Sequence, residues 1–259
     1  MSINTRKTIL NLSVAAVFAA VFTAVGFSTA HAQSNNTNRW QSALSLYAWG
    51  MNVDGTSSIG PVDNDVDLSF KDDLLDNLAG AFMIHYEAKK DKLTLFGDYM
   101  YADLDPKTEL PNGAEIDIDF KNKMWELGAA WDLTDSTAST TWQIIGGIRS
   151  NKQEFRLQVG SPVLVSVNET WYDGFIGARV RAPFGKSWHF VGRADIGAGD
   201  SDSVWNALAA LDWRYSNWGS LMFGYRWLDY DYDNGKKGSE RYVYDALQSG
   251  AFGALNFYF

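Results

Sequence analysis

Apolar and polar residues alternate along most of the chain from residue 40 to its last residue. The final stretch, SGAFGALNFYF, has small or apolar residues at positions 251, 253, 255, 257 and 259. Because successive side chains of a strand point to opposite faces, this alternation predicts strands with one apolar face. Turn-forming residues separate ten such segments, at residues 40–51, 79–89, 93–103, 114–132, 140–156, 163–181, 187–198, 203–215, 219–231 and 241–259.

The connections between these segments alternate in length. Short ones (KKDK, LTDSTAS, APFGKS and SNWG) follow every second strand, and the others are mostly longer or more acidic. This asymmetry predicts an all-β protein, a closed antiparallel transmembrane barrel of about ten strands with both termini on the short-turn side. Eight strands would result if the first segment is misread, and twelve if residues 105–132 or 150–181 contain another hairpin. Residues 69–78 (SFKDDLLDNL) predict a short surface helix in the first long loop, with a lid over the barrel mouth as the alternative.

The first 32 residues have the features of a secretory signal peptide. Arg6 and Lys7 precede an apolar run, and Ala30-His31-Ala32 has the small-x-small form of a cleavage site. A retained membrane anchor is the alternative, which the cleavage site and the polar residues 33–38 disfavour. We therefore expect cleavage near Ala32 and one barrel domain over residues 33–259.

Composition narrows the class of protein further. The chain has no cysteine, which excludes disulfides, thiolate metal sites and a lipid anchor on cysteine. It has 22 Lys and Arg against 31 Asp and Glu, and this acidic balance disfavours binding to nucleic acid. After residue 32 no apolar run reaches the roughly 20 residues of a transmembrane helix. Yet 15% of the residues are aromatic, which is typical of a barrel with an apolar outer face and aromatic girdles.

Alternation also assigns a balanced set of charged side chains to the inside of the barrel. The set has six acids and six arginines: Glu87, Asp98, Glu126, Asp173, Asp195, Asp212, Arg149, Arg179, Arg181, Arg193, Arg214 and Arg226. Basic side chains facing lipid at the midplane cost about 2–4 kcal/mol each, whereas inside a narrow barrel a guanidinium can pair with a carboxylate at two points. We interpret the set as a lumen ion network that fills and stiffens the barrel. A charge-lined narrow channel and a proton-transfer site are the alternatives.

Outward tryptophans fall near both ends of the predicted strands. Trp131, Trp142, Trp188 and Trp213 predict an aromatic girdle near the short-turn side, and Trp205 and Trp227 predict a second girdle near the other side.

The last segment, GALNFYF, resembles the terminal strand of bacterial outer-membrane β-barrels. That strand ends in an aromatic residue with apolar residues at alternate upstream positions, and Leu255, Phe257 and Phe259 match it. With the signal peptide and the alternation over 40–259, the chain resembles small OmpA/OmpX-like or omptin-like barrels. The resemblance implies location in the outer membrane of a Gram-negative bacterium and an assembly signal read by the barrel assembly machinery. It also implies contact with periplasmic chaperones, outer-membrane lipid and lipopolysaccharide.

Enzymatic chemistry has little support in the sequence. The omptin proteases, which this chain resembles in size and layout, carry acidic residues and a histidine at the external rim, and lipid A deacylases use an outward His and Ser. After residue 32 only His85 and His189 remain, and neither falls at the external rim in the predicted register. Without the usual general base there, we expect no enzyme.

An acidic stretch at residues 229–240 (DYDYDNGKKGSE) approaches the spacing of a calcium-binding loop. Its glycine comes one place late and strands flank it, so we expect a solvated external loop, no metal site and no cofactor. Loose binding of divalent cations by this stretch and by residues 63–69 remains a further hypothesis.

We therefore expect a non-enzymatic barrel, either structural or a narrow pore for small solutes, with a charge-paired lumen and acidic external loops. An adhesion or ligand-binding barrel that uses its external loops is the first alternative, and an outward-facing enzyme is the second.

Overall fold

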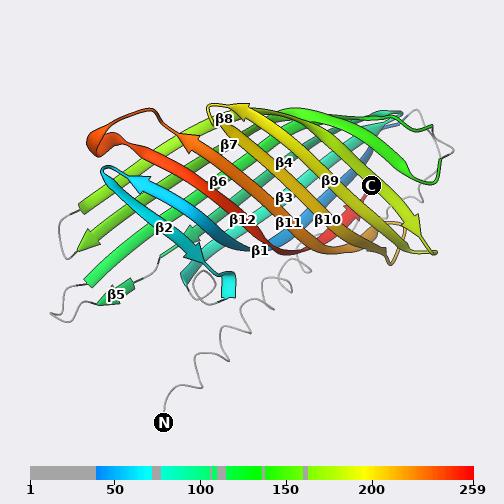
Figure 1. Cartoon of the computed structure of the whole chain (residues 1–259). Helices are drawn as coiled ribbons and strands as arrows, with labels where there is room; N and C mark the ends of the chain where they lie inside the picture. The colour runs from blue at the N-terminus through cyan, green and yellow to red at the C-terminus, as the bar shows by residue number, and fades with distance from the viewer. Residues whose placement is uncertain (1–38, 72–76, 106, 110–114, 136–137, 160–162) are drawn as a thin grey trace, which may run out of the picture. The chain divides into compact units, whose positions relative to one another are not determined.

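Ten long strands form one closed antiparallel barrel, in which neighbours in the chain are neighbours in the sheet (Figure 1). The computed structural model describes residues 39–71, 77–105, 107–109, 115–135, 138–159 and 163–259. The barrel strands are β1 (Gln41–Ile59), β3 (Leu78–Lys90), β4 (Leu93–Leu104), β6 (Glu115–Asp132), β7 (Thr141–Val159), β8 (Val163–Phe184), β9 (Trp188–Gly199), β10 (Ser203–Arg214), β11 (Gly219–Asp233) and β12 (Tyr242–Tyr258). The β12–β1 ladder closes the barrel, from Ala43 opposite Tyr258 to Ile59 opposite Tyr242. The predicted fold class and the count of ten strands are confirmed.

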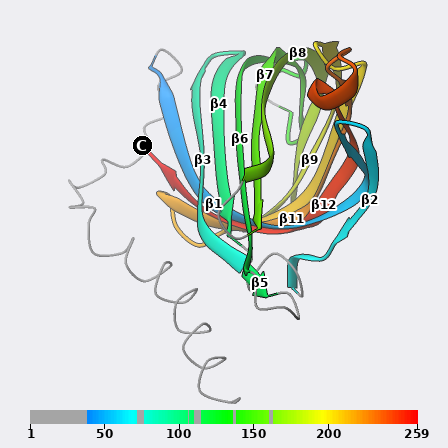
Figure 2. The same cartoon turned by 90° about the vertical axis from the view of Figure 1, so that its left-hand side faces the viewer.

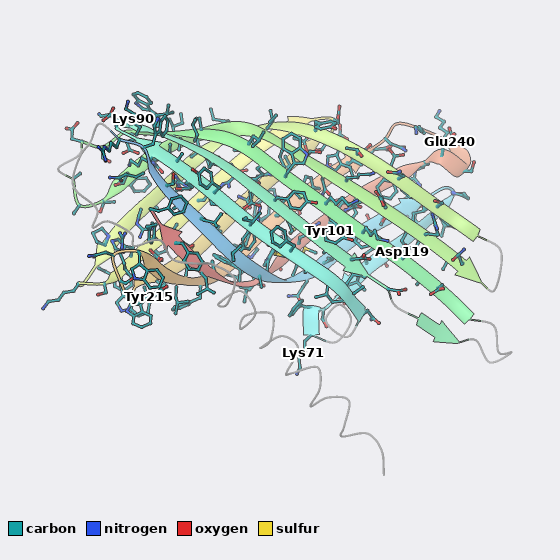
Figure 3. All side chains as sticks on the ribbon, turned by 180° about the vertical axis from the view of Figure 1, so that it is seen from behind. Lys71, Lys90, Tyr101, Asp119, Tyr215 and Glu240 are labelled. Atoms are coloured by element: carbon teal, nitrogen blue, oxygen red, sulfur yellow. The ribbon has the colours of Figure 1, made fainter. Side chains whose placement is uncertain are left out.

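The two ends of the barrel differ in their connections. We call the end that holds the start of β1 and the finish of β12 the terminal end, and the other end the distal end. The turns after β3, β8 and β10 lie at the terminal end, where Asp91 and Gly185 have φ values of 54° and 74°. Such left-handed conformations permit tight reversals of direction. Figure 3 labels Lys90 and Tyr215 at the terminal end and Glu240 at the distal end.

The distal end carries two additional strands that the sequence pattern did not predict. β2 (Val62–Leu68) pairs with the distal part of β1, from Val53 opposite Leu68 to Ile59 opposite Val62, and β5 (Lys107–Glu109) pairs with β6. We predicted that the first strand ends at residue 51, and this prediction was wrong. Residues 54–58 (DGTSS) are polar on both faces, so no alternation marks them as part of the strand. That composition fits a strand segment that faces water on both sides. The predicted helix at 69–78 lies largely outside the described residues, which omit 72–76.

The ladder between β1 and β3 is short compared with the ladder on the other edge of β1. It runs only from Gln41 opposite Lys89 to Leu46 opposite Ile84, and further along, β1 pairs with β2 instead (Figure 2). No helix within the described ranges is long and apolar enough to cross a membrane.

The outer face of the barrel is apolar. Six of its side chains are 45% to 67% exposed: Phe82, Leu127, Ile144, Ile176, Ile196 and Phe223. Exposed apolar surface of this extent marks a surface that meets an apolar environment.

Aromatic rings gather on the outer face at the terminal end. A row of rings in contact runs through Phe184, Trp188, Trp213, Tyr215 and Trp218, with centroids 5.5–6.2 Å apart; the first two contacts are stacked and the last two are edge-to-face. Trp131 and Trp142, each 50% exposed, lie near the same end of β6 and β7. On the distal halves of β10 and β11 lie Trp205, which is exposed, and Trp227, which packs against Tyr225 at 4.6 Å.

Candidate functional site

Two arginines and two carboxylates form a closed ring of ion pairs in the centre of the lumen. Arg149 on β7 donates from Nε to Glu126 Oε1 at 2.7 Å and from Nη2 to Asp195 Oδ1 at 2.8 Å. Arg193 on β9 donates from Nη2 to Glu126 Oε2 at 2.9 Å and from Nε to Asp195 Oδ2 at 2.7 Å. Each carboxylate therefore gives one oxygen to each guanidinium. We call these four side chains the central ring.

The central ring is largely withdrawn from water. The side chains of Arg149, Glu126 and Asp195 are at most 1% exposed, and that of Arg193 is 14% exposed. Phe175 covers one side, with its ring centroid 5.1 Å and 5.3 Å from the Cζ atoms of Arg149 and Arg193. Removing an ion from water costs several kcal/mol unless an opposite charge and hydrogen bonds compensate it. The four charges therefore stabilise one another and are not available to a passing ion.

Arg226 and Asn206 extend the central ring to two further strands. Arg226 on β11 donates from Nε to Asn206 Oδ1 at 2.9 Å, and its Nη2 lies 3.5 Å from Glu126 Oε1. Asn206 on β10 donates to Asp195 Oδ2 at 2.8 Å. The guanidinium of Arg226 also lies over the ring of Trp49 on β1, at 4.9 Å. The polar network thereby reaches from β6 across to β11 and β1.

On the terminal side of the central ring, His85 lies between two carboxylates. Its Nδ1 is 3.1 Å from Asp98 Oδ2 and its Nε2 is 3.1 Å from Glu87 Oε1. Each ring nitrogen of His85 therefore faces a carboxylate oxygen at hydrogen-bond distance. Tyr47 donates to Asp98 Oδ1 at 2.8 Å, and Arg179 donates to Glu87. These contacts connect β1, β4, β3 and β8 across the lumen.

Closer to the terminal end, a second set of contacts involves Arg181 and Asp212. Arg181 on β8 donates to Asp212 on β10, which is fully buried. Asn256 donates to the other oxygen of Asp212 at 3.3 Å and to Ser220 Oγ at 2.9 Å. These bonds hold β8, β10, β11 and β12 together where the barrel ends.

On the distal side of the central ring, aromatic and methionine side chains fill the lumen. Trp171 is fully buried, stacks on Tyr232 at 4.3 Å and meets the edge of Tyr230 at 5.8 Å. Tyr230 donates to Met124 Sδ at 3.6 Å. Thirteen buried side chains make up this distal plug: Trp49, Val53, Met83, Met100, Met124, Trp171, Val204, Leu228, Tyr230, Tyr232, Tyr242, Tyr244 and Ala246.

The central ring and the distal plug together occupy the cross-section of the lumen. Arg149, Trp171, Tyr230, Met124 and Leu228 are each 0% exposed although they point into the barrel. A side chain in a water-filled channel would retain exposure. The arrangement can stiffen the wall and block passage.

Some residues of the predicted lumen ion network form ion pairs with one another, and others do not. Arg179 and Glu87 pair across the lumen, as do Arg181 and Asp212. Asp173 accepts from the backbone N–H of Ser201 at 3.0 Å, and no ion pair of Asp173 occurs among the described residues.

Arg214 also departs from the predicted charge pairing. Its guanidinium lies over the ring of Tyr258 at 4.3 Å and donates to the carbonyl oxygens of Ser216 and Asn217. Arg214 is the last residue of β10. The turn that follows therefore offers carbonyl oxygens that lie closer to its guanidinium than the lumen-facing acids do. In the part of the chain that the structure describes, it makes no ion pair.

The sequence interpretation missed His85 as a network member, although a signal for it existed. His85 and Glu87 are two residues apart on one strand, so they share a face, and Asp98 is directly opposite His85 in the β3–β4 hairpin. The short turn after β3 fixes that register. Tyr47, Asn206 and Gln143 were also missed, because uncharged polar residues do not stand out in an alternating pattern.

The acidic stretch at residues 229–240 is only partly a loop. β11 continues to Asp233, so Asp229 and Asp231 are strand residues, and Asp231 is opposite Asp245 on β12. The expectation of a loop over the whole stretch was therefore wrong. No group of three or more His, Asp or Glu side chains that could hold a metal ion occurs within the described ranges.

The three residues of the predicted assembly signal lie along the outer face and end of β12. Leu255 is opposite Leu46 and Leu221, and Phe257 stacks on Trp218 at 6.4 Å. Phe259 exchanges backbone hydrogen bonds with Ser42 at 2.8 Å and 3.0 Å. Their role in recognition stays a prediction.

No protein-family model and no curated protein sequence matches the chain. Solved structures do match it. The outer membrane protease OmpT from Escherichia coli superposes with a TM-score of 0.54 at 8% identity, over 88% of this chain and 99% of that one. The translocator domain of the autotransporter NalP from Neisseria meningitidis has a TM-score of 0.48 at 12% identity, over 97% of each chain. The attachment invasion locus protein Ail of Yersinia pestis has a TM-score of 0.33 at 11% identity, over 86% and 99%.

The likeness to OmpT covers nearly the whole of both chains, and the barrel closes with ten strands. This chain has the fold of bacterial outer-membrane β-barrels. In that fold the short turns face the periplasm and the longer connections face outward. This rule predicts a periplasmic terminal end and an external distal end, and the orientation of the barrel stays a prediction.

Proposed function

We propose that this protein is a non-enzymatic, structural barrel of the Gram-negative outer membrane with a lumen that does not conduct ions. One observation carries the proposal: the side chains of the central ring and the distal plug are at most 9% exposed across the lumen, apart from Arg193 at 14%. Of the two readings that the sequence left open, this packing favours the structural barrel over the narrow pore. An ion would have to break several buried pairs at once to pass.

Ion flux from proteoliposomes tests this function. Liposomes that contain the unmodified barrel should retain trapped potassium as well as empty liposomes do. Trp171→Ala, which removes a fully buried ring from the distal plug, should increase the leak, since a cavity replaces packed atoms. Trp142→Ala is the matched control, because Trp142 lies outside the barrel and is 50% exposed. Rapid potassium release by the unmodified protein would overturn the proposal.

The absence of enzymatic activity is part of the same proposal. His85 is held between Asp98 and Glu87 inside the lumen, and His189 lies one residue from the start of β9 at the terminal end. Neither histidine lies at the distal end, where an outward-facing active site would be. The proposal also includes outer-membrane lipid, lipopolysaccharide, the barrel assembly machinery and periplasmic chaperones as the partners of the chain.

A second candidate function is a binding or adhesion surface at the distal end. It is favoured by strand length: β1, β7, β8 and β12 have 19, 19, 22 and 17 residues, whereas about 9–11 residues cross a bilayer. The excess would project as a rigid wall beyond the membrane. Replacing residues 54–67 with a short turn should abolish attachment of cells that carry the barrel to coated surfaces if this function holds, and should leave attachment unchanged if it does not.

A further inference from the structure

A cavity of about 280 Å³ lies in the lumen on the terminal side of the central ring. This volume is just below the range of about 300–1,000 Å³ that is usual for ligand pockets. Its lining runs from residues near the terminal ends of the strands, such as Ala43 on β1 and Tyr258 on β12, to Arg193 of the central ring and Trp49 of the distal plug. The cavity therefore lies between the terminal end, which we assign to the periplasm, and the central ring and distal plug.

The wall of this cavity has two chemically different halves. β3, β4, β7 and β8 contribute a polar half that includes Lys89, Thr94, Gln143, Arg179 and Arg181. β9 to β12 contribute a mixed half in which the apolar side chains Val191, Leu208, Met222, Phe252 and Ala254 lie beside Arg193, Asn206, Arg226 and Asn256. Since β9 to β12 follow one another around the barrel, these apolar side chains come from adjacent strands.

Positive charge predominates on the cavity wall. Five Lys and Arg side chains line it, whereas only Glu87 and Asp98 line it among the acids. Asp212, the partner of Arg181, is fully buried behind the wall. Arg181 itself is 35% exposed, and only its Nη2 is engaged by that partner. A guanidinium has five N–H donors, so Arg181 retains donors that can meet an anion in the cavity.

Two buried polar atoms on the wall make no hydrogen bond to any described residue. They are Thr94 Oγ1 and Asn256 Oδ1, on side chains that are 1% and 3% exposed. Buried polar groups are almost always paired, so an unpaired hydroxyl and an unpaired amide oxygen facing one cavity indicate a missing partner. Thr94 is directly opposite Lys89 in the β3–β4 hairpin, on the polar half of the wall.

We propose that this cavity binds a small amphiphilic monoanion. A carboxylate or similar head group would accept from Arg181, Arg179 and the Thr94 hydroxyl, and a short alkyl or aryl body would lie against Leu208, Met222 and Phe252. Guanidinium donors, apolar side chains on adjacent strands and an unpaired hydroxyl are what such a molecule requires. A plain inorganic anion would leave the apolar side chains without a partner, and a neutral oil would leave the arginines without one.

Equilibrium dialysis against the full barrel in lipid nanodiscs tests this inference, with empty nanodiscs as the blank. Octanoate is the probe, and octanol and acetate separate the contributions of tail and head. We expect saturable binding of octanoate above the blank, and at least tenfold weaker binding of octanol and of acetate. Octanoate binding no greater than the blank, or equal binding of octanol, would overturn the proposal.

Three variants locate the site. Arg181→Gln should weaken octanoate binding at least tenfold, whereas Lys186→Gln, which removes the same charge from the exposed β8–β9 turn, should leave it unchanged. Thr94→Val removes the unpaired hydroxyl at nearly constant volume, so it should weaken octanoate binding without loss of heat-modifiable, folded protein. If Arg181→Gln fails to fold, Thr94→Val decides alone. Undiminished octanoate binding in a folded Thr94→Val or Arg181→Gln barrel would contradict the assignment.

Discussion

Arg149 on β7 is a fully buried cation. One of its carboxylate partners lies on a strand that precedes β7 in the chain, and the other lies on a strand that follows it. Glu126 is on β6 and Asp195 is on β9, so the central ring forms only when β6 to β9 have paired. The ring ties distant segments together, and any member that is removed leaves an excess of one charge in a place that water does not reach. The largest residue-scale effects on stability should therefore come from these four side chains.

Replacing Arg149 with methionine should lower the free energy of unfolding by about 3–5 kcal/mol, because Glu126 and Asp195 would share one guanidinium in a buried site. Lys152→Met is the control, since Lys152 on the same strand pairs with Glu154 while 34% exposed. Exposed pairs contribute only about 0–1 kcal/mol. Urea unfolding in phospholipid vesicles measures both variants. Equal losses in the two variants would show that the ring adds nothing beyond an ordinary surface pair.

Asp63 at the distal end should make the β1–β2 hairpin sensitive to acid. Hydrogen bonds from Ser58 at 2.6 Å and Arg241 at 2.7 Å hold the pKa of its carboxyl below the usual value. A lowered pKa in the folded state means that the contacts stabilise the hairpin above the usual Asp pKa of about 3.9 and weaken as pH falls through the lowered value.

A spin label can follow this transition, because the chain has no cysteine and a single Asn64→Cys gives one labelled site. We expect the label to be restricted at neutral pH and mobile in acid. In the Asp63→Asn background it should be mobile at both. A label that stays equally restricted in acid, or in the Asp63→Asn background, would show that the Asp63 contacts do not hold the hairpin.

At the residue scale, alternation assigns faces but not partners. Gln143, Ile145 and Arg149 on β7 are buried while Ile144 and Ile148 are exposed, as period-two alternation requires. The pair between Arg179 on β8 and Glu87 on β3 crosses the lumen and joins residues 92 positions apart. Such a contact depends on the diameter and tilt of the closed barrel, which the sequence pattern does not specify.

At the scale of elements, close approach of neighbouring strands requires glycine at certain inward positions. Gly177 on β8 is opposite Asp195 on β9. A Cβ atom there would lie 2.1 Å from Ala194 O and 2.6 Å from the Cα of Asp195. The outward Gly174 on the same strand has its nearest such neighbour, Ala198 O, at 4.0 Å. The backbone at Gly177 is therefore part of what places Asp195 in the central ring.

Gly177→Ala should destabilise the barrel by about 1–3 kcal/mol, because β8 and β9 must separate to admit the methyl group. Gly174→Ala should change stability much less, since the methyl group would project from the outer face. Heat-modifiability on gels gives a first comparison, and urea unfolding gives the magnitude. If both variants unfold at the same urea concentration as the unmodified protein, the close approach of the strands at Gly177 does not contribute to the stability of the barrel.

The sequence predicted strands well where polar and apolar residues alternate, and poorly where polar residues occupy both faces. The nine segments after the first were placed within about three residues of their observed bounds, because alternation runs along nearly their whole length. β2 and the distal part of β1 carry polar residues on both faces, so no periodicity marks them. Backbone pairing and a few side-chain contacts, such as those of Asp63, hold these segments, and they leave little signal in the side-chain pattern.

At the scale of the whole barrel, the lumen is arranged in three layers along the axis. The terminal cavity comes first, the central ring lies next, and the distal plug lies beyond it. Charges are placed where they can pair, and aromatic and methionine side chains fill the remainder of the cross-section. This arrangement is the basis of the proposal that the lumen does not conduct ions.

Single-channel recording of the unmodified protein in a planar lipid bilayer tests the closed lumen most directly. The layered packing predicts that insertion of folded, heat-modifiable barrels produces no stable conductance steps above the bare bilayer. Discrete, long-lived steps of uniform size from the unmodified protein would contradict it, because they would show that the buried charges line an open path.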